Sequence, residues 1–162
     1  MNETAENLSI YLKDHFAGGV GAIELLEHMS ENHQDPQRRA FFQELLMEVK
    51  SDHETLHRLI HLLGFEESHT RNVGAWIAEK VSRAKLGFTG TEDLLRDVQV
   101  LETLYIGITG KRLLWQTMMR RTDEKTSFEG IDFAILERKA CDQLERVQAQ
   151  LRATTVKAFQ HL

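Results

Sequence analysis

Four long segments of the sequence repeat apolar residues every three or four positions, and this pattern limits the fold more than any other feature. They span about residues 4–31, 36–63, 91–121 and 126–159. That period is typical of amphipathic α-helices that bury one face. Average usage would give about eight prolines in a chain of this size, yet the sequence has one, Pro36. We therefore expect an all-α fold built from four long helices.

Local signals predict where these helices begin and end. Asp35 is a favourable N-cap for the second helix, and Pro36 then occupies the first helical position, where proline is tolerated. Gly64 follows the last apolar position and is expected to end that helix. Capping-box patterns at Thr89–Glu92 and Thr126–Glu129 predict the starts of the third and fourth helices.

The link between the second and third helices, residues 65–90, is too long for a turn. Within it, Arg71–Leu86 has an amphipathic pattern that predicts a short helix. Such a link favours a crossover between two helical hairpins, one made by the first two long helices and one by the last two. No repeat or low-complexity tract divides the chain, so residues 1–162 are expected to form one domain, a four-helix bundle.

Composition and charge exclude several classes of protein. The formal charge of −5 argues against binding nucleic acid through its phosphates. The sequence has one cysteine, Cys141, which rules out an internal disulfide framework and is typical of a reducing compartment. No uncharged apolar run approaches the roughly 18 residues of a membrane span, and the acidic start is unlike a secretory signal. We therefore expect a cytoplasmic protein that binds neither membranes nor nucleic acid.

Several stretches of the sequence resemble small uncharacterised bacterial proteins of the ferritin-like superfamily. They are Tyr11–His15, Glu24–His28, Ala75–Lys80 and Leu101–Lys111 with Trp115. The resemblance covers nearly the whole chain. It implies a ferritin-like four-helix bundle, in which two helical hairpins are joined by a crossover that contains a short helix between the second and third long helices.

The resemblance also implies a di-metal site, in which two helices each give a glutamate and two give Glu-x-x-His. The matching positions are Glu24 on the first helix, Glu54 and His57 on the second, Glu102 on the third and Glu137 on the fourth. The partner of Glu137 would be Ala140, so one imidazole is missing. Helical periodicity places Glu54 nearly opposite the core and turns Glu24 well away from it. We therefore predict that an intact di-iron site is absent.

A second group of polar residues falls on or beside the apolar faces. His15, Asp52, His53 and Tyr105 are expected inside the bundle, and Glu102 could lie at the same level. We interpret them first as a hydrogen-bonded polar layer that fixes the register of the helices, because buried polar groups need partners. The other interpretation is a small-ligand or mononuclear metal site. Its candidate metal ligands are His15, Asp52, His53 and Glu102, and iron or manganese would be the metal.

These observations favour a function without catalysis. We expect a ferritin-like bundle that lacks an intact di-iron site and acts through a protein partner or a small ligand. The third helix is apolar over a wide arc, which could serve a homodimer. The alternative is a metal-dependent oxidase or ferroxidase with a degenerate set of carboxylate and histidine ligands. The sequence also predicts an ion pair between Arg112 and Glu137, and an inert thiol at Cys141.

Overall fold

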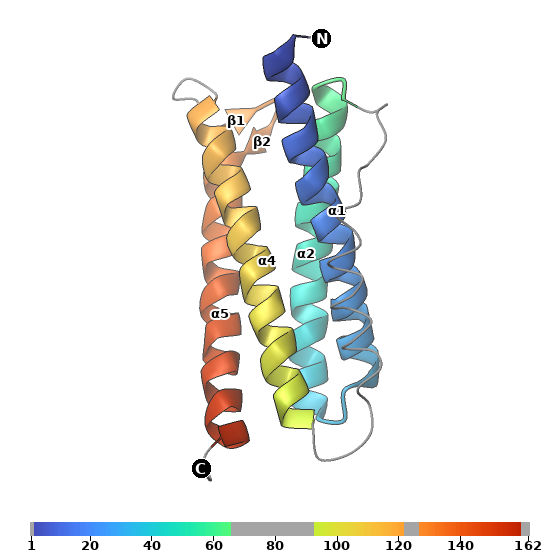
Figure 1. The fold of residues 1–162 in the computed structure, drawn as a ribbon, viewed down its shortest axis with the longest axis vertical. Coiled ribbons are helices and arrows are strands. Elements are labelled where there is room, and N and C mark those ends of the chain that lie inside the picture. The colour runs from blue at the N-terminus through green and yellow to red at the C-terminus, as the bar shows by residue number, and fades with distance from the viewer. Residues whose placement is uncertain (1, 66–92, 122–126, 160–162) are drawn as a thin grey trace.

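The computed structural model describes residues 2–65, 93–121 and 127–159. Four long helices lie side by side along the length of the molecule (Figure 1), and a very short β-hairpin precedes the last of them. The helices are α1 (Glu3–Asn32), α2 (Pro36–Leu62), α4 (Asp93–Arg121) and α5 (Phe133–Phe159), and the strands are β1 (Ser127–Phe128) and β2 (Ile131–Asp132). The expected all-α, four-helix arrangement is confirmed.

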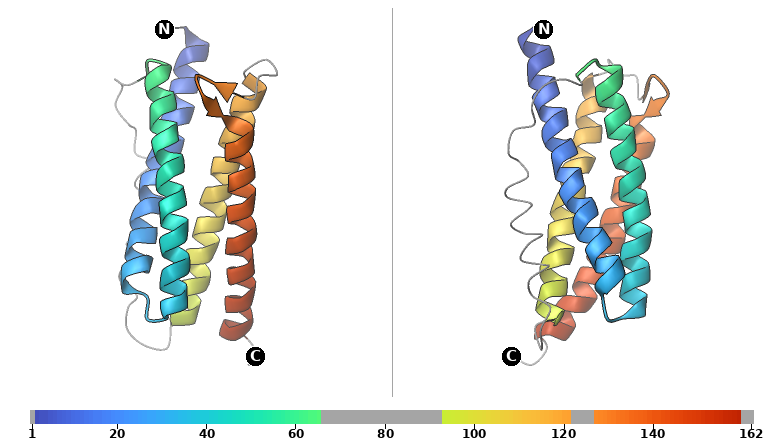
Figure 2. Two further views of the ribbon diagram at one scale, coloured as in Figure 1. Left: turned by 180° about the vertical axis from the view of Figure 1, so that it is seen from behind. Right: turned by 90° about the vertical axis from the view of Figure 1, so that its right-hand side faces the viewer.

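The helices associate as two hairpins. Helix α1 packs mainly on α2, and α4 packs mainly on α5, while α1 also contacts α4 (Figure 2). Both hairpins agree with the sequence prediction. The predicted helix Arg71–Leu86 and the predicted cap Thr89–Glu92 lie outside the described residues. In the part of the chain that the structure describes, no helix has an apolar stretch long enough to cross a bilayer.

The turn between α1 and α2 follows the predicted capping pattern. The carboxylate of Asp35 accepts a hydrogen bond from the backbone N–H of Gln37 at 2.8 Å, and Pro36 begins the helix. This hydrogen bond is the main reason why the pKa of Asp35 is lowered. At the other end of α2, Gly64 has φ +71°, the left-handed conformation that commonly ends a helix.

The start of α5 corrects the sequence prediction. The pattern Thr126–Glu129 does not begin the helix, because β1 and β2 pair there and Glu129 and Gly130 form the turn with φ of 46° and 76°. Positive φ at both turn positions is typical of a type I′ hairpin. The true N-cap is Asp132, whose carboxylate accepts the backbone N–H groups of Ala134 and Ile135, both at 3.0 Å.

The apolar core consists of two clusters, one towards each end of the bundle. The first includes Leu26, Met29 and Phe42 and lies near the turn between α1 and α2. The second includes Leu12 and Trp115 and lies near the short β-hairpin. On α2, Asp52 lies between Val49 of the first cluster and Leu56 of the second. A polar group therefore sits between the two apolar clusters.

Candidate functional site

Three polar side chains from three helices meet at the middle of the bundle. Lys111 on α4 donates from Nζ to Asp52 Oδ2 on α2 and to Gln143 Oε1 on α5, each at 2.5 Å. Gln143 Nε2 also donates to Asp52 Oδ2 at 3.2 Å. Asp52 is 3% exposed and Gln143 is 1% exposed. The three residues therefore form a closed network that links α2, α4 and α5.

Each member of this network occupies a helical position that would otherwise be apolar. Asp52 lies between Val49 and Leu56, three and four positions away, on the buried face of α2. The same three- and four-residue spacing brings side chains to one helix face. Gln143 follows the buried Ala140 on α5 in the same way. The helix faces themselves thus force these polar groups into the interior.

Two opposing effects act on the pKa of Lys111 in this network. Burial lowers the pKa of the Lys111 ammonium group, and the charge of Asp52 opposes this effect. A buried charge without a partner would cost several kcal/mol, on the order of 3–5. The pairing of Lys111 with Asp52 therefore leaves no net charge from these two groups in the interior of the bundle.

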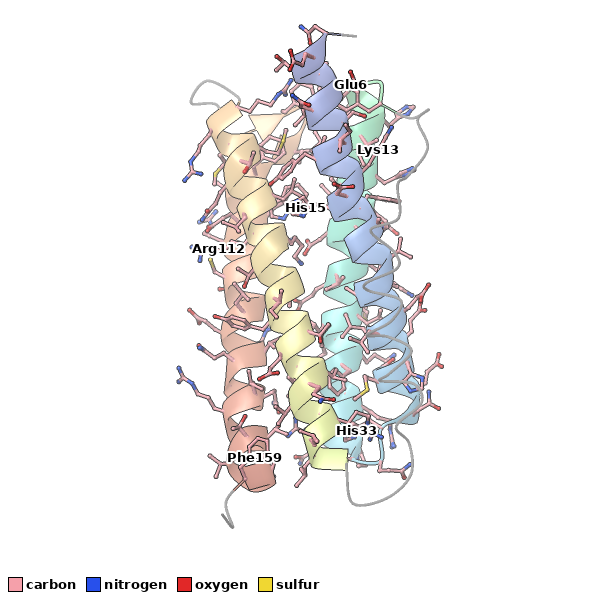
Figure 3. The ribbon with its side chains drawn as sticks, in the orientation of Figure 1. Glu6, Lys13, His15, His33, Arg112 and Phe159 are labelled. Carbon is pink, nitrogen blue, oxygen red and sulfur yellow. The ribbon has the colours of Figure 1, made fainter. Side chains whose placement is uncertain are left out.

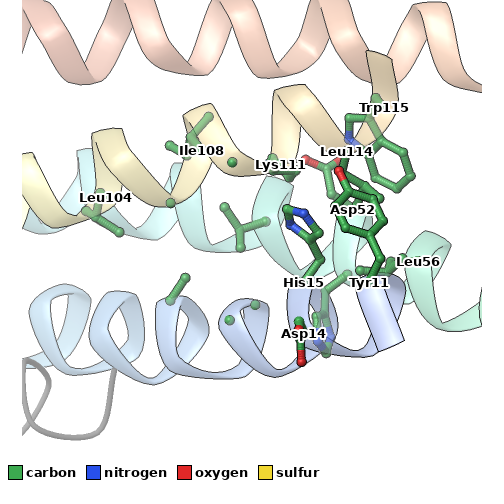
Figure 4. A pocket seen from close by; sticks show the side chains of 17 residues that line it. Tyr11, Asp14, His15, Asp52, Leu56, Leu104, Ile108, Lys111, Leu114 and Trp115 are labelled. Atoms are coloured by element: carbon green, nitrogen blue, oxygen red, sulfur yellow. Dashed lines mark hydrogen bonds and ion pairs between the residues drawn. The ribbon is translucent and has the colours of Figure 1, made fainter. Parts of the chain in front are cut away.

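A cavity of about 410 Å³ lies beside the network, between α1, α2 and α4 (Figure 4). Its lining is chiefly apolar, and Asp52 and Lys111 form part of its wall. Four glycines also line it, Gly18 and Gly19 on α1 and Gly107 and Gly110 on α4. Because a glycine has no side chain, these positions leave space where α1 approaches α4.

Two histidines contribute to the wall of the cavity. The ring of His53 stacks on Phe16 with a centroid distance of 4.1 Å, and its Nε2 lies 3.0 Å from the Phe16 carbonyl oxygen. A Cβ on Gly19 would come within 2.4 Å of His53 Cδ2, so this packing needs a glycine there. His15 meets Tyr11 edge to face at 4.7 Å and lies between α1 and α4 (Figure 3). Burial lowers the pKa of both histidines, which favours the neutral imidazoles.

The structure brings together three of the four candidate metal ligands. His15, Asp52 and His53 line the same cavity. Glu102 is exposed on α4 and takes no part in it, and Tyr105 does not line it either. Within residues 2–65, 93–121 and 127–159, no three His, Cys, Asp or Glu side chains are grouped so that they could hold a metal ion.

The di-metal positions implied by the ferritin-like resemblance do not converge. Glu24, Glu54, His57 and Glu102 are all exposed, as helical periodicity predicts for the first two. Glu137 is half-buried, but its carboxylate is engaged by Arg112. The residues present at these positions therefore do not fit a pair of bridged metal ions.

The predicted pair between Arg112 and Glu137 is confirmed. Arg112 Nε donates to Glu137 Oε1 at 2.6 Å, and Gln116 Nε2 donates to the same oxygen at 3.0 Å. The hydrogen bond from Arg112 is the main reason why the pKa of Glu137 is lowered. Cys141 Sγ lies 3.5 Å from this oxygen, and burial raises the pKa of the thiol. The protonated, unreactive form of Cys141 is thus favoured.

Sequence reasoning missed the partners of Asp52. Lys111 is a charged residue, and lysines are mostly exposed in folded proteins. The signal that could have found it is spacing, because Lys111 lies three positions from both Ile108 and Leu114, which are buried. Gln143 carries the same signal relative to Ala140 and Val147.

A second buried polar contact was also missed, at the end of the bundle near the turn between α1 and α2 (Figure 3). His33 Nδ1 accepts the backbone N–H of Asp35 at 3.0 Å, so the ring proton lies on Nε2, which donates to Asp97 Oδ2 at 2.9 Å. Both residues are buried. This contact connects the turn between α1 and α2 to helix α4.

No protein-family model, curated protein or solved structure matches this chain significantly. Any statement about function therefore rests on the fold, on the geometry of its interior and on the sequence itself.

Proposed function

We propose that this chain is a ferritin-like helical bundle without an intact di-iron site, and that it binds a small ligand without catalysing a reaction on it. The observation that carries the proposal is the cavity of about 410 Å³ between α1, α2 and α4, whose buried carboxylate, Asp52, is already neutralised by Lys111. Ligand pockets typically have volumes of about 300–1,000 Å³ and chiefly apolar walls.

The ferritin-like part of the proposal rests on the two hairpins and on the sequence resemblance. A bundle with this pairing of helices is the arrangement expected of that superfamily. Its carboxylate centre would lie inside the bundle, and the described interior of this chain contains the ammonium group of Lys111. The positive charge of Lys111 balances the negative charge of Asp52, which is the one carboxylate of the network.

The alternative, a metal-dependent oxidase or ferroxidase, draws support from the shared location of His15, Asp52 and His53. A divalent cation at Asp52 would have to displace or face the Lys111 ammonium group, and like charges repel strongly in a buried site. Gln143 Nε2 also donates a hydrogen bond to the Asp52 oxygen that Lys111 contacts. The ligand-binding function is therefore better supported than metal chemistry.

A homodimer remains a prediction. Helix α4 carries exposed apolar side chains at Ile106 and Leu113, which are 55% and 53% exposed. Light scattering coupled to size-exclusion chromatography measures the molecular mass directly. A mass twice that of the chain supports a dimer, and a mass equal to that of the chain contradicts it.

The proposed function is tested by a thermal-shift screen of small apolar and amphipathic compounds on the wild type and on Gly110→Leu. Gly110 lines the cavity on α4, and leucine there adds a side chain to the cavity wall while raising helix propensity. Compounds that raise the melting temperature of the wild type but not of the variant bind in the cavity. If no compound has this effect, the proposal is wrong.

A further inference from the structure

The cavity wall contains a buried hydrogen-bond donor for which the described residues provide no acceptor. Trp115 is 0% exposed and lines the cavity, and its indole Nε1 meets no hydrogen-bond partner among the described residues. The ring is fixed by stacking on Phe133, with a centroid distance of 6.2 Å. Most buried polar groups in folded proteins are hydrogen-bonded, so an unpaired one calls for an explanation.

The charged groups around the cavity cancel each other or point elsewhere. Asp52 and Lys111 neutralise each other, and Gln143 completes their hydrogen bonding. His15 and His53 are half-buried and favour the neutral form. Asp14 points away from the other lining side chains (Figure 4). The interior of the cavity therefore offers no uncommitted charge to an ionic ligand.

We infer that the cavity binds an uncharged, mainly apolar small molecule whose carbonyl oxygen accepts the indole N–H of Trp115. The inference rests on the proposed function and names its ligand class. An indole nitrogen only donates, so the ligand must supply an acceptor. The apolar lining receives the rest of the molecule, as in most small-molecule sites.

The chain has two tryptophans, Trp76 and Trp115, so the indole N–H signal of Trp115 can be followed by ¹H–¹⁵N NMR. The wild type gives two indole signals, and the variant Trp76→Phe keeps one, which identifies the signal of Trp115. Only the Trp115 signal is expected to move when a probe binds. The probes are valerophenone, an aryl ketone, and pentylbenzene, which has a similar shape without the oxygen. We expect valerophenone to shift the Trp115 signal downfield and to bind about tenfold more tightly than pentylbenzene, the effect of one hydrogen bond.

Two controls locate the site and define the ligand class. Gly110→Leu, which adds a side chain to the cavity wall, is expected to abolish the shift of the Trp115 signal. The anion 5-phenylpentanoate is expected to bind more weakly than the ketone. If the anion binds more tightly, the uncharged class is wrong.

The outcomes separate this inference from the proposed function. Equal binding of both neutral probes in the wild type, lost in Gly110→Leu and without a downfield shift of the Trp115 signal, overturns the inference and leaves the proposed function standing. Failure of all three probes to bind overturns the inference, whereas the proposed function then depends on the wider compound screen alone.

Discussion

Lys111 Nζ lies 2.5 Å from Asp52 Oδ2, and this contact joins α4 to α2 in the centre of the bundle. Gln143 bonds to both groups and brings in α5. The network lies between two apolar clusters, so it fixes the relative height of three helices. It also leaves the cavity beside it without a free buried charge.

Removing one partner of this network should be costly. Asp52→Ala leaves the Lys111 ammonium buried without a counter-charge, which is expected to lower the free energy of unfolding by about 3 kcal/mol. The triple variant Asp52→Leu, Lys111→Met, Gln143→Leu replaces the whole network by apolar groups and is expected to be closer to the wild type. Urea unfolding of both variants measures the difference. Equal stability of Asp52→Ala and the wild type would contradict the account.

The stability of the protein should fall in mild acid because of His15 and His53. Burial lowers the pKa of both groups in the folded state, while an unfolded histidine titrates at about 6.5. Between these values the two histidines bind more protons in the unfolded chain, so their contribution to stability falls as the pH decreases below about 6.5 and is constant above it. Denaturant unfolding between about pH 7.5 and 5.5 measures this slope.

Single histidine variants assign the slope to these residues. His15→Leu should reduce the pH dependence, since it removes one of the two groups. The same slope in His15→Leu as in the wild type would show that His15 is not the source.

Two glycine substitutions on facing helices should have opposite effects. Gly110→Ala places a Cβ 3.8 Å from His15 Cε1, an ordinary contact, and should stabilise the protein by about 1 kcal/mol through helix propensity. Gly19→Ala places a Cβ 2.4 Å from His53 Cδ2, so the ring must move and its contact with Phe16 is disturbed. Gly19→Ala should therefore have the lower melting temperature of the two. The reverse order would argue against the packing of His53 on α1.

The contact between His33 and Asp97 should contribute measurably to stability. Asp97→Ala leaves the buried Nε2–H of His33 without an acceptor, which is expected to cost about 1–3 kcal/mol. Glu102→Ala on the same helix is the matched control, since Glu102 is exposed and its loss should change stability by less than about 0.5 kcal/mol. Chemical denaturation compares the two, and equal effects would speak against the buried contact.

The sequence predicted those parts of the fold that depend on local pattern. The four helices follow from apolar spacing, and the start of α2 follows from Asp35 and Pro36. The start of α5 was misplaced because a capping-box pattern also fits the residues of a tight hairpin. Burial of Ile131 and Phe133 decides between them, and that burial depends on tertiary packing.

The candidate site was predicted only in part, for a similar reason. Periodicity placed Asp52, His15 and His53 towards the interior, but it could not show which groups from other helices meet them. Lys111 and Gln143 lie 59 and 91 residues from Asp52 in the sequence. That the indole N–H of Trp115 lacks an acceptor among the described residues also depends on tertiary packing, which helical periodicity does not predict.

The most direct test of the central claim is the iron content of untagged protein. The protein is loaded with ferrous iron without oxygen, desalted, and analysed for bound metal. Because Lys111 and Gln143 occupy the buried carboxylate, we predict less than about 0.1 equivalent of iron per chain, far below the stoichiometric loading of a metal centre with a complete ligand set. Two equivalents of iron per chain would contradict the claim that this bundle lacks a di-iron site.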